Sequence, residues 1–159
     1  MREILFRGKD IAGNWHYGDL INLTKEIKQI CNHNQLEHAH SVNPETVGQY
    51  TGLTDKNGKK IFEGDIVEMS FEGTGNTYGE DGRMYDYDFY GHKIGVVSFG
   101  SNGTFLNVKY GELHIDGEIV EGWTPSRRSR IAGYRSEIIG NIHDNPELLK
   151  GGSGDDKVY

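Results

Sequence analysis

The Asn57-Gly58 pair places the tightest local constraint on how this chain can fold. It lies in the stretch DKNGK, residues 55–59, shortly after an extended segment at 47–53. Because Gly and Asn accept the positive φ values of a tight turn, the pair predicts a β-hairpin. Gly64-Asp65 predicts a second corner, and residues 66–71 then alternate between apolar and polar side chains, as a strand does.

The same pattern of short alternating segments between glycine turns recurs along the 159 residues, which include 23 glycines and three prolines. It predicts further strands at 3–8, 14–23, 93–99, 103–110, 112–115, 118–123 and 136–142. We therefore expect an all-β (β-rich) fold of small barrel-like or SH3-like strands and hairpins, in which closure hides the sheet edges. A proline and an early glutamate in DNPELLK, residues 144–150, predict a short C-terminal helix.

Residues 1–150 have the length of a single domain. Three segments depart from the strand pattern: 24–43, 73–91 and 122–136. We interpret them as variable excursions from the β framework. The last segment, GGSGDDKVY at 151–159, is typical of a flexible tail.

The net charge of −7 at pH 7 bounds the possible partners. Nonspecific DNA binding normally requires a basic surface that displaces counterions from phosphates, so we do not expect it. Cys31, the single cysteine, cannot form an internal disulfide, and the start MREILFRG lacks the apolar run of a signal peptide. No segment has the apolar length that spans a bilayer. We expect a cytoplasmic protein with no membrane partner.

Residues 122–136, GWTPSRRSRIAGYRS, reverse the sign of the chain's charge. Four arginines and no acidic residue occur there: Arg127, Arg128, Arg130 and Arg135. Arginine pairs bidentately with phosphate, and Trp123 and Tyr134 offer rings on which a nucleobase can stack. The segment is therefore a candidate site for a small anionic, nucleotide-type ligand. The alternative is a solvated loop whose arginines pair with acidic residues elsewhere.

Residues 73–91 mix aromatic with acidic side chains. The aromatic candidates for contact with a partner are Tyr78, Tyr85, Tyr87, Phe89 and Tyr90. A segment this long between strands suits a binding loop for a protein partner. The alternation in MYDYDFY, 84–90, equally suits an extended hairpin arm that pairs with another subunit.

Four residues in the first excursion have the chemistry of zinc ligands: Cys31, His33, His38 and His40. Without a C-x-x-C pair they are more typical of a polar surface loop, and we expect no metal site.

No phosphate-binding glycine loop, nucleophile elbow, zinc-protease helix or dinucleotide fingerprint occurs in the sequence. Single histidines can act as bases, but none has a partner at a defined spacing. We therefore expect a protein that acts by binding and not by catalysis, with no cofactor.

Four stretches of the chain resemble the YopX family of bacteriophage and prophage proteins. They are FRGK at Phe6–Lys9, W.YGDLI at 15–21, VNPETVGQYTGLTDKNGKKIFEGDIV at 42–67 and IIGNIHDNPELL at 138–149. The resemblance is weakest between residues 73 and 136. It implies a β-rich fold with barrel-like elements, a phage or prophage origin and homo-oligomers. It implies no established enzymatic activity, so no residue inherits a catalytic role.

Two functions are consistent with these patterns. In the first, the protein is a phage accessory factor that sequesters a small anionic, nucleotide-type signal of host antiphage defence. In the second, it is an interaction module or inhibitor that docks on a host or phage protein through its acidic, Tyr-rich segment.

Overall fold

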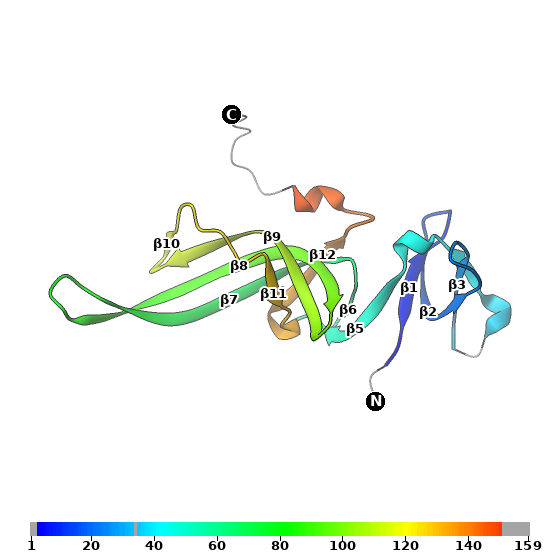
Figure 1. Cartoon of the computed structure of the whole chain (residues 1–159), viewed down its shortest axis with the longest axis horizontal. Helices are drawn as coiled ribbons and strands as arrows, with labels where there is room; N and C mark the ends of the chain where they lie inside the picture. The colour runs from blue at the N-terminus through cyan, green and yellow to red at the C-terminus, as the bar shows by residue number, and fades with distance from the viewer. Residues whose placement is uncertain (1–2, 34, 151–159) are drawn as a thin grey trace.

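The computed structural model of the chain describes residues 3–33 and 35–150, and most of these residues lie in β-strands (Figure 1). Within this part, twelve strands form two antiparallel sheets, and the longest helical segment has four residues. The prediction of an all-β fold is confirmed. Residues 151–159, predicted to form a flexible tail, lie outside the described residues. No helix among the described residues is both long and apolar enough to cross a membrane.

The first sheet has the strand order β4-β3-β2-β1-β5-β6. Its strands are β1 (Phe6–Lys9), β2 (Trp15–Asn22), β3 (Lys28–Cys31), β4 (His40–Val42), β5 (Gly48–Thr54) and β6 (Lys60–Phe62). Residues 24–43, predicted to be an excursion, supply β3 and β4 and so complete this sheet. Such short strands show little alternation of apolar and polar residues and are stabilised by pairing with a neighbouring strand. Here β3 pairs with β2, from Asp19 with Cys31 to Asn22 with Lys28.

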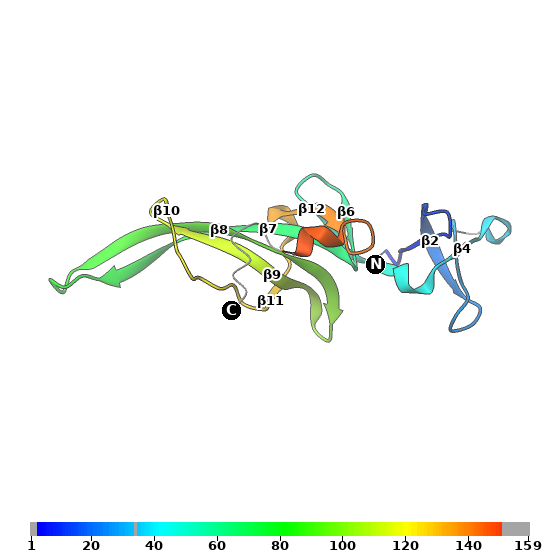
Figure 2. The ribbon, with the colours of Figure 1, turned by 90° about the horizontal axis from the view of Figure 1, so that it is seen from above.

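The second sheet has the order β10-β9-β8-β7-β12, and β11 also pairs with β9. Its strands are β7 (Asp65–Tyr78), β8 (Met84–Gly100), β9 (Gly103–Ile115), β10 (Glu118–Ile119), β11 (Arg128–Arg130) and β12 (Ser136–Asn141). The sheet curls into a half-barrel (Figure 2). Its core contains Ile61, Val67, Met69, Val97 and Leu106, so that β6 of the first sheet also packs into the second. The prediction of a barrel-like arrangement of strands is confirmed, with the sheet forming an open half-barrel.

Two glycine turns occur where the sequence predicts them, although Asn57 does not share the positive φ expected of the Asn-Gly pair. Gly58, in the turn between β5 and β6, has a φ of 79°. Asp116 and Gly117, between β9 and β10, have φ values of 48° and 89°, the left-handed pair of a tight hairpin turn.

Asp55 fastens the β5–β6 turn to the second sheet. One oxygen of this buried carboxylate accepts hydrogen bonds from the backbone N–H groups of Asn57 and Lys59, both at 2.9 Å. The other oxygen accepts from the N–H of Ile138 on β12 at 3.2 Å. Burial raises the pKa of Asp55, but these three donors outweigh it and leave the pKa below its ordinary value. One side chain thus closes the turn and holds it on β12.

The structure corrects three boundaries. Gly111, predicted to separate two strands, lies inside β9, where a Cβ would come 2.3 Å from the carbonyl oxygen of His92. The glycine therefore permits a close strand approach instead of a turn. Of the strand predicted at 118–123, only Glu118–Ile119 pairs. The predicted C-terminal helix is one 3-10 turn, η4 (Pro146–Leu149), because so few residues cannot offset the cost of nucleating an α-helix.

β7 and β8 extend beyond the half-barrel as a long arm, at the left of Figure 1. Their residues pair one to one from Ile66 with Val96 to Tyr78 with Met84, without a bulge. Of the two forms considered for residues 73–91, the extended hairpin is the one adopted. Two 3-10 turns, η1 (Leu36–His38) and η2 (Pro44–Thr46), connect strands of the first sheet, and η3 (Gly133–Arg135) precedes β12.

Candidate functional site

Two arginines on β11 share one aromatic ring on β9. Strand alternation places Arg128 and Arg130 on the same face, opposite Asn107 and Phe105. The guanidinium carbon of Arg128 lies 3.8 Å from the Phe105 ring centroid, and that of Arg130 lies 5.9 Å from it. Arg130 Nη2 also donates to the carbonyl oxygen of Asn102 at 3.2 Å. We call Arg128, Arg130 and Phe105 the arginine patch.

Gly100 leaves the space that Arg128 occupies. A Cβ at this position would lie 2.2 Å from Arg128 Nη2 and 2.9 Å from the Phe105 ring. The guanidinium group therefore lies between a glycine and a ring, an arrangement that restricts its N–H groups before any ligand arrives.

The arginines of residues 122–136 have no acidic partner in the described part of the chain. The ion pairs found there involve Arg7, Lys9, Lys56, Lys60 and Arg83, and the histidines His16, His33 and His114. The alternative in which these arginines pair with acidic residues elsewhere is thus not the arrangement that the structure adopts. Their positive charge remains uncompensated at the surface of an acidic protein.

The other predicted ligand-binding residues lie apart from the patch. Trp123 packs on Phe71 of β7 with a centroid separation of 5.8 Å. Arg135 lies over the ring of Tyr134 at 5.3 Å, in η3 and not on β11. Arg127 immediately precedes β11, and its carbonyl oxygen accepts from Val108 N at 2.9 Å. Since alternation continues there, its side chain points away from the face that carries Arg128 and Arg130.

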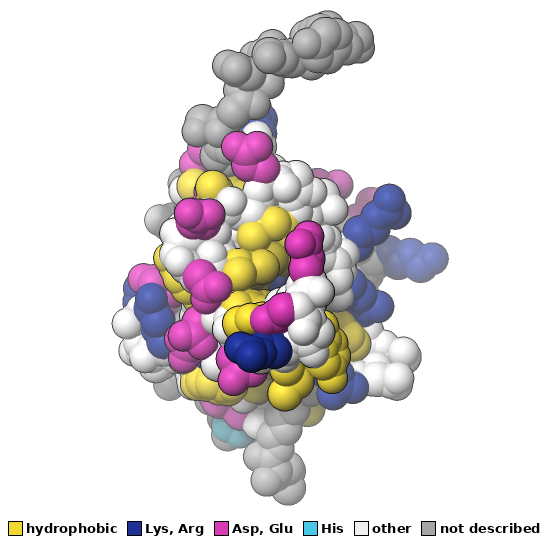
Figure 3. Space-filling view, turned by 90° about the vertical axis from the view of Figure 1, so that its left-hand side faces the viewer, with side chains coloured by type: hydrophobic (Ala, Val, Ile, Leu, Met, Phe, Trp, Pro, Cys, Tyr) yellow, Lys and Arg dark blue, Asp and Glu magenta, His cyan; other side chains and the backbone are white. Residues whose placement is uncertain are grey.

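The arm has two faces of different chemistry, because side chains alternate along β8. One face carries Tyr85, Tyr87 and Phe89, and the other carries Tyr90 together with Asp86 and Asp88. Tyr78 faces Met84 near the tip and is 74% exposed. The predicted aromatic set is therefore divided between the two faces. Viewed from the tip (Figure 3), acidic side chains gather toward the left and several Lys and Arg side chains project at the right.

The rings of the aromatic face lie over glycines of β7. Phe89 is paired with Gly73, and Tyr87 with Gly75. A Cβ on Gly73 would lie 2.6 Å from the tip of Phe89, and one on Gly75 would lie 2.3 Å from Tyr87 Cζ. The glycines thus make room for the rings, which cover the backbone of the neighbouring strand.

The four Cys and His candidates do not meet. Cys31 is buried in β3, and His33 Nδ1 lies 2.9 Å from Asp19 Oδ2 at the surface. His40 stacks on His16 with centroids 3.9 Å apart, and His38 lines the same hollow. The described residues contain no group of three side chains that could hold a metal ion.

Sequence analysis missed the partner of His16. Its Nε2 lies 2.8 Å from Asp10 Oδ2, and this contact, with the backbone N–H of Asn14, lowers the pKa of the Asp10 carboxyl. Asp10 lies in the turn before β2. The sequence signal for this contact was an acidic residue in a turn, six residues before a histidine in a strand.

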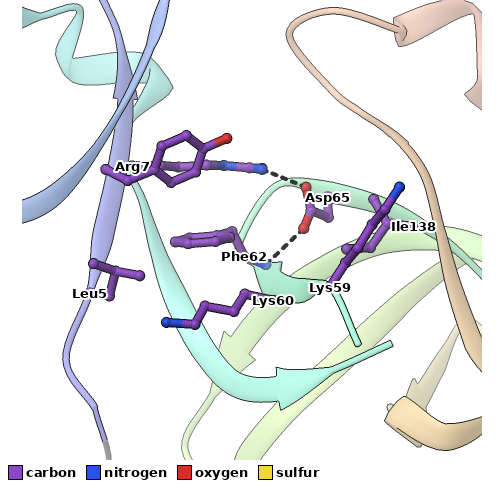
Figure 4. A pocket seen from close by; sticks show the side chains of 8 residues that line it. Leu5, Arg7, Lys59, Lys60, Phe62, Asp65 and Ile138 are labelled. Carbon is purple, nitrogen blue, oxygen red and sulfur yellow. Dashed lines mark hydrogen bonds and ion pairs between the residues drawn. The ribbon is translucent and has the colours of Figure 1, made fainter. Parts of the chain in front are cut away.

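A cavity of about 500 Å³ lies between the two sheets (Figure 4). Its lining residues come from both sheets: Leu5, Arg7, Tyr17, Lys59, Lys60, Phe62, Asp65 and Ile138. Arg7 Nη1 lies 2.7 Å from Asp65 Oδ1, and the other oxygen of Asp65 accepts from Phe62 N at 2.7 Å. Burial raises the pKa of the Asp65 carboxyl, and the charge of Arg7 opposes this shift.

Two cations that line this cavity, Arg7 and Lys60, are paired within the chain, although Arg7 Nε is buried without a hydrogen-bond partner among the described residues. Arg7 is held by Asp65 and by the carbonyl oxygen of Glu63, and Lys60 pairs with Glu3 at 2.8 Å. The residues that line the cavity therefore connect the two sheets. The arginines without an acidic partner lie elsewhere, on β11. The signal for this connection between the sheets was a charged residue inside each of two apolar stretches, Arg7 in LFRG and Asp65 in GDIV.

The comparison with protein families gives a match to the family described as YopX protein, over residues 5–150. The chain belongs to the YopX family. The matched residues of this YopX chain include both sheets, the arm and β11. The comparison with curated proteins gives no match. Roles for individual residues of this YopX protein are therefore argued from their own geometry.

Proposed function

We propose that this YopX-family protein binds a small anionic, nucleotide-type ligand at the arginine patch and acts by holding it. One observation carries the proposal: Arg128 and Arg130 lie on the same ring, and neither has an acidic partner among the described residues. Two guanidinium groups on one face can each donate a pair of hydrogen bonds to phosphate oxygens. Pre-oriented donors lose less conformational entropy on binding, which favours affinity.

The surrounding charge favours a compact ligand over a nucleic-acid duplex. With a net charge of −7, the rest of the molecule repels a long polyanion, while a small ligand contacts only the patch. We infer that the ligand is sequestered and not converted, as in a phage or prophage accessory protein that removes a signal of host antiphage defence in the bacterial cytoplasm. Such a role requires an affinity above that of the host receptor.

Calorimetric titration with ADP, pyrophosphate and adenosine tests the proposal. We expect binding of ADP and pyrophosphate, and none of adenosine, which lacks the charge. The Arg128→Ala/Arg130→Ala variant should bind ADP at least about tenfold more weakly, since a hydrogen bond to a charged group contributes about 1.5 kcal/mol or more. Arg83→Ala removes one positive charge from the exposed arm tip and is the control for the loss of an arginine outside the patch. An unchanged affinity in the double variant would reject this site.

Gly100→Ala offers a second variant that keeps the total charge. The added methyl group occupies the space of Arg128 Nη2, so the guanidinium group must leave the Phe105 ring. We expect weaker ADP binding than in the wild type, with a thermal midpoint that shows the fold is retained. Ligand released from wild-type protein by denaturation should be chemically intact, as analysed by mass spectrometry.

The second candidate function is docking on a host or phage protein through the arm. It is favoured by the exposure of large side chains there: Tyr78 74%, Met84 59%, Tyr85 49% and Tyr90 48%. Paired aromatic and acidic groups suit contact with a basic, partly apolar partner. Replacing Tyr85 and Tyr90 with serine should abolish co-purification of such a partner while leaving ADP binding unchanged; co-purification that survives both changes would reject docking at the arm.

A further inference from the structure

The outer edge of β7 has no partner strand along the arm. β12 pairs with β7 only as far as Met69, opposite Ser136. From residue 70 to 78, the inner edge of β7 pairs with β8, and no described strand pairs with the outer edge. In Figure 1 this edge forms the lower margin of the arm. Its backbone N–H and C=O groups are therefore available to another strand.

This edge lacks the features by which natural sheets prevent further pairing. Residues 70–78, SFEGTGNTY, contain no proline and no lysine, and Glu72 is their only charged residue. The pairing of β7 with β8 has no bulge that would twist the edge away. An unprotected edge of this length is typical of a strand that pairs with another chain.

We propose that β7 pairs antiparallel with β7 of a second copy of this chain, about a two-fold axis at Thr74. This proposal is independent of the arginine patch. In that register Thr74 faces its own copy, Gly73 faces Gly75, and Glu72 faces Asn76. The single charge of the edge thus meets an amide instead of its own equivalent, and Thr–Thr is a favourable cross-strand pair. The sequence is self-complementary, as a two-fold interface requires.

The rings on the glycines add an apolar contact across the same axis. Phe89 lies over Gly73 and Tyr87 over Gly75. Since paired strands lie about 4.8 Å apart, the Phe89 ring of one copy comes beside the Tyr87 ring of the other. The two aromatic faces then form one continuous layer over a sheet that joins both arms.

A cysteine at the proposed axis tests the register directly. Thr74→Cys should form an intermolecular disulfide on mild oxidation, because directly opposed Cβ atoms lie about 5 Å apart. Asn76→Cys should not, because the two copies of residue 76 are offset by about 13 Å along the strands. Cys31 is 3% exposed and does not interfere. Equal cross-linking of both variants, or of neither, would overturn the proposed pairing.

Charge reversal provides a second test, read by sedimentation velocity. Wild-type protein should sediment as a dimer, with twice the 17.9 kDa of the chain. Asn76→Glu places two like-charged pairs across the axis and should shift the equilibrium toward monomer by about tenfold or more, and adding Glu72→Lys should restore the dimer. Ser101→Glu, in the distant β8–β9 turn, is the control for charge alone.

Three outcomes would contradict the proposal. The first is a monomeric wild-type chain, which would indicate that the edge of β7 pairs with a different protein. Asn76→Glu would remain dimeric if the copies meet on another surface. Removal of residues 151–159 would change the oligomeric state if that segment, and not a second β7, covers the edge.

Discussion

Arg7 Nη1 lies 2.7 Å from Asp65 Oδ1, with only 7% and 2% of the two side chains exposed, and this ion pair joins the first sheet to the start of β7. The guanidinium group also lies 4.8 Å from the Trp15 ring and 5.0 Å from the Phe62 ring. Charge and aromatic packing therefore coincide where the two sheets meet.

Asp65→Asn should lower the free energy of unfolding by about 3 kcal/mol, because it leaves Arg7 buried without a counter-charge. Urea denaturation measures the loss. The joint variant Arg7→Met/Asp65→Leu should be more stable than Asp65→Asn, since it buries no charge. Lys60→Met breaks the exposed pair with Glu3 and should change stability by less than about 1 kcal/mol. Equal losses for the buried and the exposed pair would contradict this account.

Asp55→Ala should destabilise the protein by about 2 kcal/mol, since three backbone N–H groups lose their acceptor. The change should also increase hydrogen exchange at the amides of Asn57, Lys59 and Ile138 above that of the rest of β12. Exchange that rises uniformly over the chain would argue against a local role in fastening the turn.

Asp144 should make stability depend on pH in the acid range. Its carboxylate accepts hydrogen bonds from Asn141, Lys9 and Trp15, and these donors hold its pKa below the ordinary value. Such a group stabilises the fold above the unfolded-state pKa of about 3.9, and its contribution is lost as the pH falls through the lower, folded-state pKa. The urea concentration at the midpoint of unfolding should therefore decrease as the pH is lowered below about 4.

Asp144→Asn should flatten that acid dependence, while Asp86→Asn, on the exposed face of the arm, should leave it unchanged. If both variants follow the wild-type curve, the bonds of Asp144 do not contribute to acid stability.

Two glycine substitutions should differ because they meet different atoms. At Gly75 an added Cβ meets the tip of Tyr87, which can rotate, whereas at Gly91 it meets the backbone oxygen of Glu112 at 2.1 Å. We expect Gly75→Ala to cost less than about 1 kcal/mol and Gly91→Ala about 2 kcal/mol or more. The midpoints of thermal unfolding rank the stability of the two variants. The reverse order would show that the backbone of β9 moves aside more easily than the Tyr87 ring.

The sequence predicted those parts of the fold that local chemistry specifies. Gly58 and the Asp116-Gly117 pair form turns between predicted strands because few residue types accept positive φ, whereas Asn57 does not adopt the positive φ expected of it. β3 and β4 were missed because they depend on pairing with β2, a contact between segments whose own patterns are weak. Likewise, nothing in a linear reading shows that Asp55 reaches Ile138.

The structure divides the arginines of the predicted site between two places. Composition located the basic segment, but strand alternation separates Arg127 from Arg128 and Arg130, and η3 removes Arg135 from the strand. Phe105 was not predicted, because the residue that supports the two arginines lies on a strand that is remote in sequence.

The register of rings on glycines also limits how the arm can change in length. Phe89 and Tyr87 each lie over a glycine directly opposite on β7, Gly73 and Gly75, and side chains return to the same face only at every second residue. Inserting one residue in either strand would move the rings to the acidic face and place side chains beneath their former positions. The arm can therefore lengthen or shorten only by two residues in each strand at once, so that its reach changes in discrete steps.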